Sequence, residues 1–314
     1  MRPFIPIIEL HFSNKCTGNC VICSKAHGGD SSPLLDLETF DYIVEGLTTV
    51  DFDVIQVGGD GDSFLNPIFF DALQILREEF PDKTLTLFTN GYMLTKENSE
   101  RIIGDKLLDN IETRIDSVNP VLFKQSTGLD FETVKNNLLY FMKINDFVRQ
   151  HIIYFPLFLY KECVQTYLNK YPTHYAHINE AFLQNERMAV FNTFNHANSP
   201  NLFNFRVSEI CLWGEREDVQ PAEGQCSQLN GAFKNQIYIY PNGNIGLCPY
   251  DDGQNTFILG NVFDDSLDDV WTSDNRNNII KDIKDGKYVG RYPCTNPVAC
   301  DSFDFFRIRG YYGK

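Results

Sequence analysis

Residues 7–23 read IIELHFSNKCTGNCVIC, an apolar run that leads directly into a loop with three cysteines. The apolar residues 7–12 predict a buried strand, whereas the loop is rich in glycine, asparagine and serine and cannot fill a core. Cys16, Cys20 and Cys23 supply three thiolates in the pattern C-x-x-x-C-x-x-C. Three thiolates can hold a four-iron cluster and leave one iron open to a ligand, so the pattern favours an iron–sulfur site.

From the residues alone, a zinc site and a set of buried thiols also stay open for this triplet. Structural zinc takes four closed ligands, and no fourth cysteine lies nearby, although His11 and His27 are available. Buried structural thiols are the second alternative, and the polar composition of the loop disfavours them.

Helical and extended patterns alternate along the chain after this loop. The alternation predicts an α/β fold, in which a parallel sheet has its helices packed outside it. In such a sheet the loops at the carboxyl ends of the strands carry the ligands. The predicted helices are 36–48, 68–79, 96–107 and 131–144, and the later predicted strands are 54–57, 85–88, 110–115 and 151–155.

Three polar loops follow these strands at the same predicted edge. The turn GGDGDSFLNP, residues 58–67, comes after the second strand, Thr89 and Asn90 end the third, and Asp116 and Ser117 follow the fourth. Each loop alone is also an ordinary turn, because Gly-Asp and Asn-Gly are favoured in turns. Together with the cysteine loop, they predict one ligand site.

The cysteine triplet directly after the first strand resembles the signature of the radical S-adenosylmethionine (SAM) superfamily. The resemblance implies a partial (β/α)6 TIM-like barrel and a [4Fe-4S] cluster on Cys16, Cys20 and Cys23, with SAM chelating its open iron. It also implies reductive cleavage of SAM to a 5′-deoxyadenosyl radical, which removes a hydrogen atom from the substrate.

Other positions of the chain match the family's SAM-binding loops. The family usually has Glu-Pro where this chain has Asp62-Ser63, and Ile22 stands at a position that is often aromatic, so the match is incomplete. The residues that the resemblance assigns to SAM binding are Gly59, Asp60, Gly61, Asp62, Thr89, Asn90, Asp116 and Ser117.

Four further cysteines lie beyond residue 225, around a predicted β-hairpin at 236–248 with an Asn-Gly turn. Four thiolates can close off a second cluster. Residues 226–302 resemble the SPASM/twitch extension of the superfamily, with too few cysteines for the full SPASM form. This resemblance implies an auxiliary [4Fe-4S] cluster, while a zinc site and unligated thiols stay open. The four cysteines are Cys226, Cys248, Cys294 and Cys300, of which the last two stand farther apart than is usual in the family.

The sequence predicts two parts. Residues 1–225 form the radical SAM core, within which 160–225 shows only a weak pattern, and residues 226–314 form a small cluster domain of a β-hairpin plus helix. Two cysteines fall in the weakly patterned stretch. Cys163 is interpreted as a small buried hydrophobe. Cys211 is either a buried thiol beside Leu212 and Trp213 or a catalytic hydrogen-atom donor to a substrate radical.

Composition narrows the partners and the location. The chain has 314 residues and a formal net charge of −15, and an acidic surface repels phosphate backbones, so nucleic acid is not an expected partner. The opening residues lack the organisation of a signal peptide and are too short for a membrane span, so a cytoplasmic protein is expected. In that compartment its nine cysteines would stay reduced.

The resemblance implies a radical SAM oxidoreductase or modifying enzyme that acts on a small metabolite or a peptide. A reductant such as flavodoxin or ferredoxin is the implied protein partner. Two alternatives stay open: a peptide maturase or epimerase that uses Cys211, and a non-catalytic iron–sulfur or zinc binding protein. The departure at Asp62-Ser63 is the only support for the non-catalytic alternative.

Overall fold

A computed structural model describes residues 2–20, 34–59, 61–154, 180–195, 203–207, 232–248 and 257–288. Its strands are β1 (Ile7–Leu10), β2 (Val54–Val57), β3 (Thr84–Thr89), β4 (Asn110–Ile115), β5 (Arg149–Tyr154), β6 (Phe203–Val207), β7 (Gln236–Ile239), β8 (Asn244–Gly246) and β9 (Ile258–Asn261). They form one sheet in the order β6-β5-β4-β3-β2-β1-β7-β8-β9. Pairing is parallel from β6 through to β7 and antiparallel from β7 to β9.

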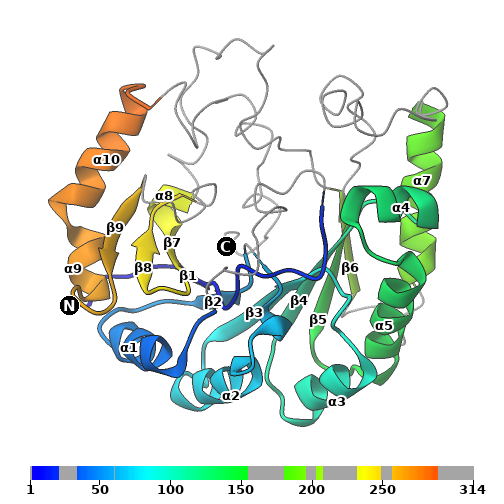
Figure 1. Ribbon diagram of the computed structural model, residues 1–314, viewed down its shortest axis with the longest axis horizontal. Coiled ribbons are helices and arrows are strands. Elements are labelled where there is room, and N and C mark those ends of the chain that lie inside the picture. The colour runs from blue at the N-terminus through cyan, green and yellow to red at the C-terminus, as the bar shows by residue number, and fades with distance from the viewer. Residues whose placement is uncertain are drawn as a thin grey trace.

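The sheet curves into an open barrel with helices along its convex side (Figure 1). The predicted α/β class and partial TIM-like barrel are therefore confirmed. The helices are α1 (Leu37–Leu47), the 3₁₀ turn η1 (Ser63–Leu65), α2 (Phe69–Glu79), α3 (Lys96–Gly104), α4 (Pro120–Thr127), α5 (Phe131–Ile144), α7 (Glu180–Phe194), α8 (Ala232–Asn235), α9 (Leu267–Thr272) and α10 (Asp274–Lys284).

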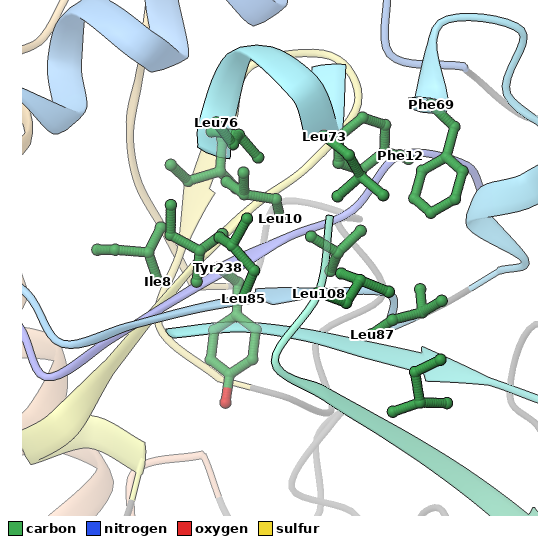
Figure 2. Packing of buried hydrophobic residues seen from close by; sticks show 14 of the residues in the cluster. Ile8, Leu10, Phe12, Phe69, Leu73, Leu76, Leu85, Leu87, Leu108 and Tyr238 are labelled. Carbon is green, nitrogen blue, oxygen red and sulfur yellow. The ribbon is translucent and has the colours of Figure 1, made fainter. Parts of the chain in front are cut away.

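The two faces of the sheet differ in polarity, because side chains alternate along each strand. Ile8 and Leu10 of β1 belong to the apolar core on the helix side, where Leu73 and Leu76 of α2 also lie (Figure 2). Each such leucine, once buried, contributes about 2 kcal/mol of transfer free energy. Glu9, between the two β1 core residues, occupies the other face. The apolar pattern thus decides which side of the sheet is left for polar groups.

Several elements, among them α4, α7 and β6, formed where the sequence predicted none. Helix α4 begins with Asn119, whose side chain accepts from Val121 N and Leu122 N, and ends at Gly128 with φ +75°. Helix α7 and strand β6 lie inside the weakly patterned stretch, and β6 pairs in parallel with β5. Short helices depend more on their caps than on apolar periodicity, which explains why the pattern missed α4.

The predicted hairpin is present as β7 and β8, and Gly243 supplies the positive φ of its turn. Strand β7 also pairs in parallel with β1, so the hairpin continues the core sheet. The helix predicted to follow this hairpin within residues 226–314 is present as α9, capped by the Ser266 side chain, which accepts from Asp269 N. The division of the chain after residue 225 stays a prediction.

Candidate functional site

The cysteine loop and the glycine-rich turn after β2 lie in direct contact. Asp62 N donates to the carbonyl oxygen of Lys15 at 2.7 Å. A Cβ added to Gly61 would lie 2.1 Å from Ser13 O and 2.5 Å from Lys15 O, both backbone atoms. A side chain at this position would push the two loops apart, so the close approach requires glycine.

Thr17 connects two of the predicted site residues, Asp62 and Asn90, at the carboxyl edge of the sheet. Its Oγ1 donates to Asp62 Oδ2 at 2.9 Å and accepts from Asn90 Nδ2 at 2.9 Å. The Asn90 Nδ2 also lies 3.6 Å from Cys16 Sγ. A hydrogen-bonded path therefore runs from the turn after β2, through the cysteine loop, to the end of β3.

The Asp62 carboxylate is buried and already engaged by the protein. Its Oδ1 accepts from Phe64 N at 3.3 Å while its Oδ2 accepts from Thr17. Burial raises the pKa of Asp62, and the hydrogen bonds from Thr17 and Phe64 oppose that rise. The family resemblance assigned this carboxylate to SAM binding, and that role stays a prediction; each oxygen already accepts one hydrogen bond from the protein.

The end of helix α4 supports the cysteine loop from the other side. Asn19 N donates to Thr127 O at 2.8 Å, and Cys20 Sγ lies 4.0 Å from the same oxygen. Cys16 is exposed and accepts from Gly18 N at 3.4 Å, whereas Cys20 is partly buried. The accessible sulfur of Cys16, with an N–H group directed at it, suits a thiolate that binds an iron–sulfur cluster. Cys23 and Asp60 lie outside the described residues.

A carboxylate–imidazole pair lies behind the glycine turn. Glu9 Oε1 is 3.1 Å from His11 Nε2, and a Cβ on Gly59, which has φ +101°, would lie 2.5 Å from that nitrogen. The His11 ring meets Tyr240 edge-on at 5.0 Å between centroids. Glu9 also accepts from Gln236 Nε2 at 2.5 Å. The turn predicted to bind SAM thus packs on groups that reach across to β7.

At the end of β4 the predicted residues are held by two other charged groups. Asp116 forms a bidentate ion pair with Arg114, with distances of 2.6 and 2.8 Å. Ser117 Oγ donates to Glu186 of α7, which also accepts from Val118 N at 3.3 Å. Burial, with the nearby charges of Glu186 and Asp116, raises the pKa of Tyr154 well above its usual range. The assignment of Asp116 and Ser117 to SAM binding stays a prediction.

In the C-terminal part, only Cys248 of the predicted cluster ligands falls within the described residues. It follows β8, is 4% exposed and belongs to the apolar core with Ile245 and Phe257. The other predicted residues of this part and the proposed hydrogen-atom donor lie outside the described residues, namely Cys226, Cys294, Cys300 and Cys211.

Two residues that organise the site, Thr17 and Glu186, were not predicted from the sequence. Thr17 stands inside the cysteine motif, and its hydroxyl was the available signal. Glu186 gave none, because it lies 69 residues from Ser117 in a stretch without clear periodicity. Thr89 closes β3, and its Oγ1 accepts from Gly91 N at 3.1 Å, which shapes the turn that presents Asn90. Among the described residues, no helix is long and apolar enough to cross a membrane.

Solved structures share this fold. The structure of BtrN in complex with AdoMet and 2-DOIA superposes with a TM-score of 0.59 at 16% identity, covering 94% of both chains. SuiB of Streptococcus suis bound to S-adenosylmethionine gives a TM-score of 0.59 at 18% identity, over 88% of this chain and 68% of SuiB. At these identities the likeness establishes the fold.

Two curated proteins of Methanocaldococcus jannaschii are similar over part of the chain. The FeMo cofactor biosynthesis protein NifB is 23% identical over 128 residues, which cover 38% of this chain and 42% of NifB. A probable GTP 3′,8-cyclase is 26% identical over 133 residues, which cover 42% of this chain and 43% of that protein. The chain thus matches less than half the length of these relatives.

Two family models match the chain directly. The model of the radical SAM superfamily matches residues 10–165, and that of SPASM, an iron–sulfur cluster-binding domain, matches residues 226–300. The cofactors that these domains imply are a [4Fe-4S] cluster with SAM for the first and auxiliary iron–sulfur clusters for the second. The chain belongs to the radical SAM superfamily and carries a C-terminal SPASM domain.

Proposed function

We propose that this protein cleaves SAM reductively and uses the resulting radical to oxidise or modify a carbon centre of a small metabolite or peptide. The observation that supports it most is the convergence of the cysteine loop, the glycine turn and Asn90 through Thr17. The convergence brings the sulfur of Cys16 beside the two loops that the family resemblance assigns to SAM.

The residues of this edge have distinct parts in the proposal. Cys16, Cys20 and Cys23 would hold the cluster, while Gly61 lets the turn after β2 contact the cysteine loop and Gly59 lets it pack on His11, so that both glycines would place the turn beside bound SAM. When bound, the cluster and SAM supply a 5′-deoxyadenosyl radical after uptake of one electron. The electron would come from a reductant such as flavodoxin or ferredoxin in a reducing, cytoplasmic environment. Asp60, Asp62, Thr89, Asn90, Asp116 and Ser117 complete the proposed cofactor contacts.

The C-terminal cysteines would act after hydrogen abstraction, when the substrate radical is oxidised. Cys226, Cys248, Cys294 and Cys300 would hold an auxiliary [4Fe-4S] cluster, whose chemistry there is to accept the electron left on the substrate after hydrogen abstraction. The match of the SPASM model to residues 226–300 supports this assignment, because that range contains all four cysteines.

Both substrate classes have precedent among proteins of this fold. BtrN has been crystallised with 2-DOIA, and SuiB with the precursor peptide SuiA. A peptide maturase or epimerase is therefore the second candidate, in which Cys211 would return a hydrogen atom to the substrate radical.

The test is SAM cleavage by the anaerobically reconstituted chain. With dithionite and SAM, the protein should form 5′-deoxyadenosine, measured by chromatography and mass spectrometry. Omission of dithionite is the matched control and should abolish the product. If the iron-loaded protein forms no 5′-deoxyadenosine, the proposal is wrong and a non-catalytic iron–sulfur protein is the better interpretation.

A further inference from the structure

The orientation of the Asn90 side-chain amide is fixed by its neighbours. Its Oδ1 accepts from the backbone N–H of Tyr92 at 2.9 Å, so the oxygen faces its own turn. The Nδ2 group therefore faces the cysteine loop, where one N–H donates to Thr17 Oγ1 and the other is directed at Cys16 Sγ. An amide held in this way cannot rotate its oxygen toward Cys16 without breaking the bonds to both Tyr92 and Thr17.

Thr17 transmits this constraint to a buried anchor. Because its hydroxyl proton goes to Asp62 Oδ2, its oxygen is left to accept from Asn90. Asp62 is 2% exposed and is fixed by its own N–H on Lys15 O and by Phe64 N on Oδ1. The path from Asp62 through Thr17 to Asn90 thus positions one amide N–H relative to one sulfur.

Hydrogen bonds to cluster sulfurs are a main determinant of cluster reduction potential. An N–H donor stabilises the more negative, reduced state and so raises the potential. Cys16 Sγ has two such N–H groups near it, Gly18 N at 3.4 Å and Asn90 Nδ2 at 3.6 Å. The donor from Gly18 is part of the backbone, whereas the side-chain donor of Asn90 can be removed by a substitution.

We propose that Asn90, held by Thr17 and Asp62, is a positioning residue that raises the reduction potential of the SAM-binding cluster through Cys16, and that it does not itself bind SAM. This inference rests on the proposed function for its cluster, and it removes Asn90 from the cofactor contacts of that function. A raised potential makes the cluster easier to reduce by a cellular electron donor before SAM is cleaved.

The test compares Asn90→Leu and Thr17→Val with two matched controls. Thr17→Ser keeps the hydroxyl, and Asn136→Ala removes an exposed amide from α5. Redox titration of the reconstituted 314-residue chain, monitored by electron paramagnetic resonance, gives the midpoint potential of the cluster whose signal changes when SAM is added. Titration of the same signal with SAM gives the SAM dissociation constant.

Asn90→Leu should lower the midpoint potential, Thr17→Val should lower it less, and both controls should match the unsubstituted chain. The SAM dissociation constant should stay within about twofold in every variant, a change of less than about 0.5 kcal/mol. If Asn90→Leu leaves the potential unchanged and weakens SAM binding instead, Asn90 is a SAM ligand and the inference is wrong. Should Asn90→Leu fail to hold a cluster, the Thr17→Val and Thr17→Ser pair decides, and equal potentials in that pair overturn the inference.

The result also separates this inference from the proposed function. If the unsubstituted chain cleaves SAM and the potentials do not move, the inference alone fails. If the potentials move while no 5′-deoxyadenosine forms, the role of Asn90 stands and the proposed function fails.

Discussion

The surroundings of Cys16 and Cys248 are opposite in character, although both sulfurs are expected to bind iron. Cys16 is exposed, lies in a polar loop and has two N–H groups directed at its sulfur. Cys248 is 4% exposed and packs in the apolar core at the end of a hairpin. An accessible site with N–H donors suits a cluster that must meet a cofactor, whereas a desolvated sulfur suits a closed cluster that only exchanges electrons.

Replacing the accessible sulfur should have the largest effect. Cys16→Ala leaves at most two of the three thiolates of the motif, so the SAM-binding cluster should be lost, with roughly four iron atoms per chain. Formation of 5′-deoxyadenosine should fall to the background without enzyme. Iron analysis and the chromatographic assay measure both quantities on the same anaerobic sample.

The free energy of unfolding of the metal-free chain serves as the control for Cys16→Ala. Because Cys16 is exposed and outside the apolar core, its loss should change the free energy of unfolding of the metal-free chain by less than about 0.5 kcal/mol. Retention of full iron content and cleavage by Cys16→Ala would contradict the assignment of the cysteine loop.

Replacing the buried sulfur should separate the two halves of the reaction. Cys248→Ala should lose the auxiliary iron and abolish product formation from substrate, while uncoupled cleavage of SAM persists. The truncation also removes a packed atom from the core and should destabilise the metal-free chain by about 1 kcal/mol. Iron content, 5′-deoxyadenosine and chemical denaturation distinguish these effects, and loss of SAM cleavage together with product would argue against two separate sites.

The contrast between these sulfurs was only partly predictable from the sequence. Periodicity predicted strands β1 to β5 and helices α1, α2, α3 and α5, and the position of Cys16 and Cys20 directly after β1 placed the first site at the carboxyl edge of the sheet. The support of Cys20 by Thr127 spans 107 residues, and that of Ser117 by Glu186 spans 69. Contacts at such separations depend on how helices α4 and α7 pack, and a pattern within one segment carries no information about packing between segments.

The burial of Cys248 could not be predicted from the sequence, because it also depends on contacts between distant segments. The hairpin was predicted from its Asn-Gly turn, but its attachment to the core depends on the parallel pairing of β7 with β1. That pairing joins segments more than two hundred residues apart, and it carries Tyr240 to His11 behind the glycine turn. The polar inner face, with Glu9 among its residues, follows from alternation along β1 once the helix side is known.

The smallest effect on iron content and SAM cleavage is expected at Asp36, at the start of helix α1, where a substitution changes stability without touching either sulfur. Its side chain accepts from Thr39 N at 2.8 Å and caps α1, so Asp36→Ala should cost about 1 kcal/mol of unfolding free energy, and Asp36→Asn much less. The backbone and side-chain hydrogen bonds from Thr39 hold the pKa of Asp36 below its ordinary value of 3.8. A lowered pKa in the folded state means that the ionised cap stabilises the protein above the unfolded-state pKa and that this contribution fades as pH falls through the folded-state value.

Denaturant unfolding at neutral pH and near pH 3 should therefore show the difference between Asp36→Ala and the unsubstituted chain shrinking on acidification. Iron content and SAM cleavage at neutral pH should stay unchanged, because the N–H groups of Gly18 and Asn90 near Cys16 do not come from α1. A parallel loss of iron in Asp36→Ala would mean that general destabilisation alone empties the cluster site, and the losses expected for Cys16→Ala would then no longer identify a ligand.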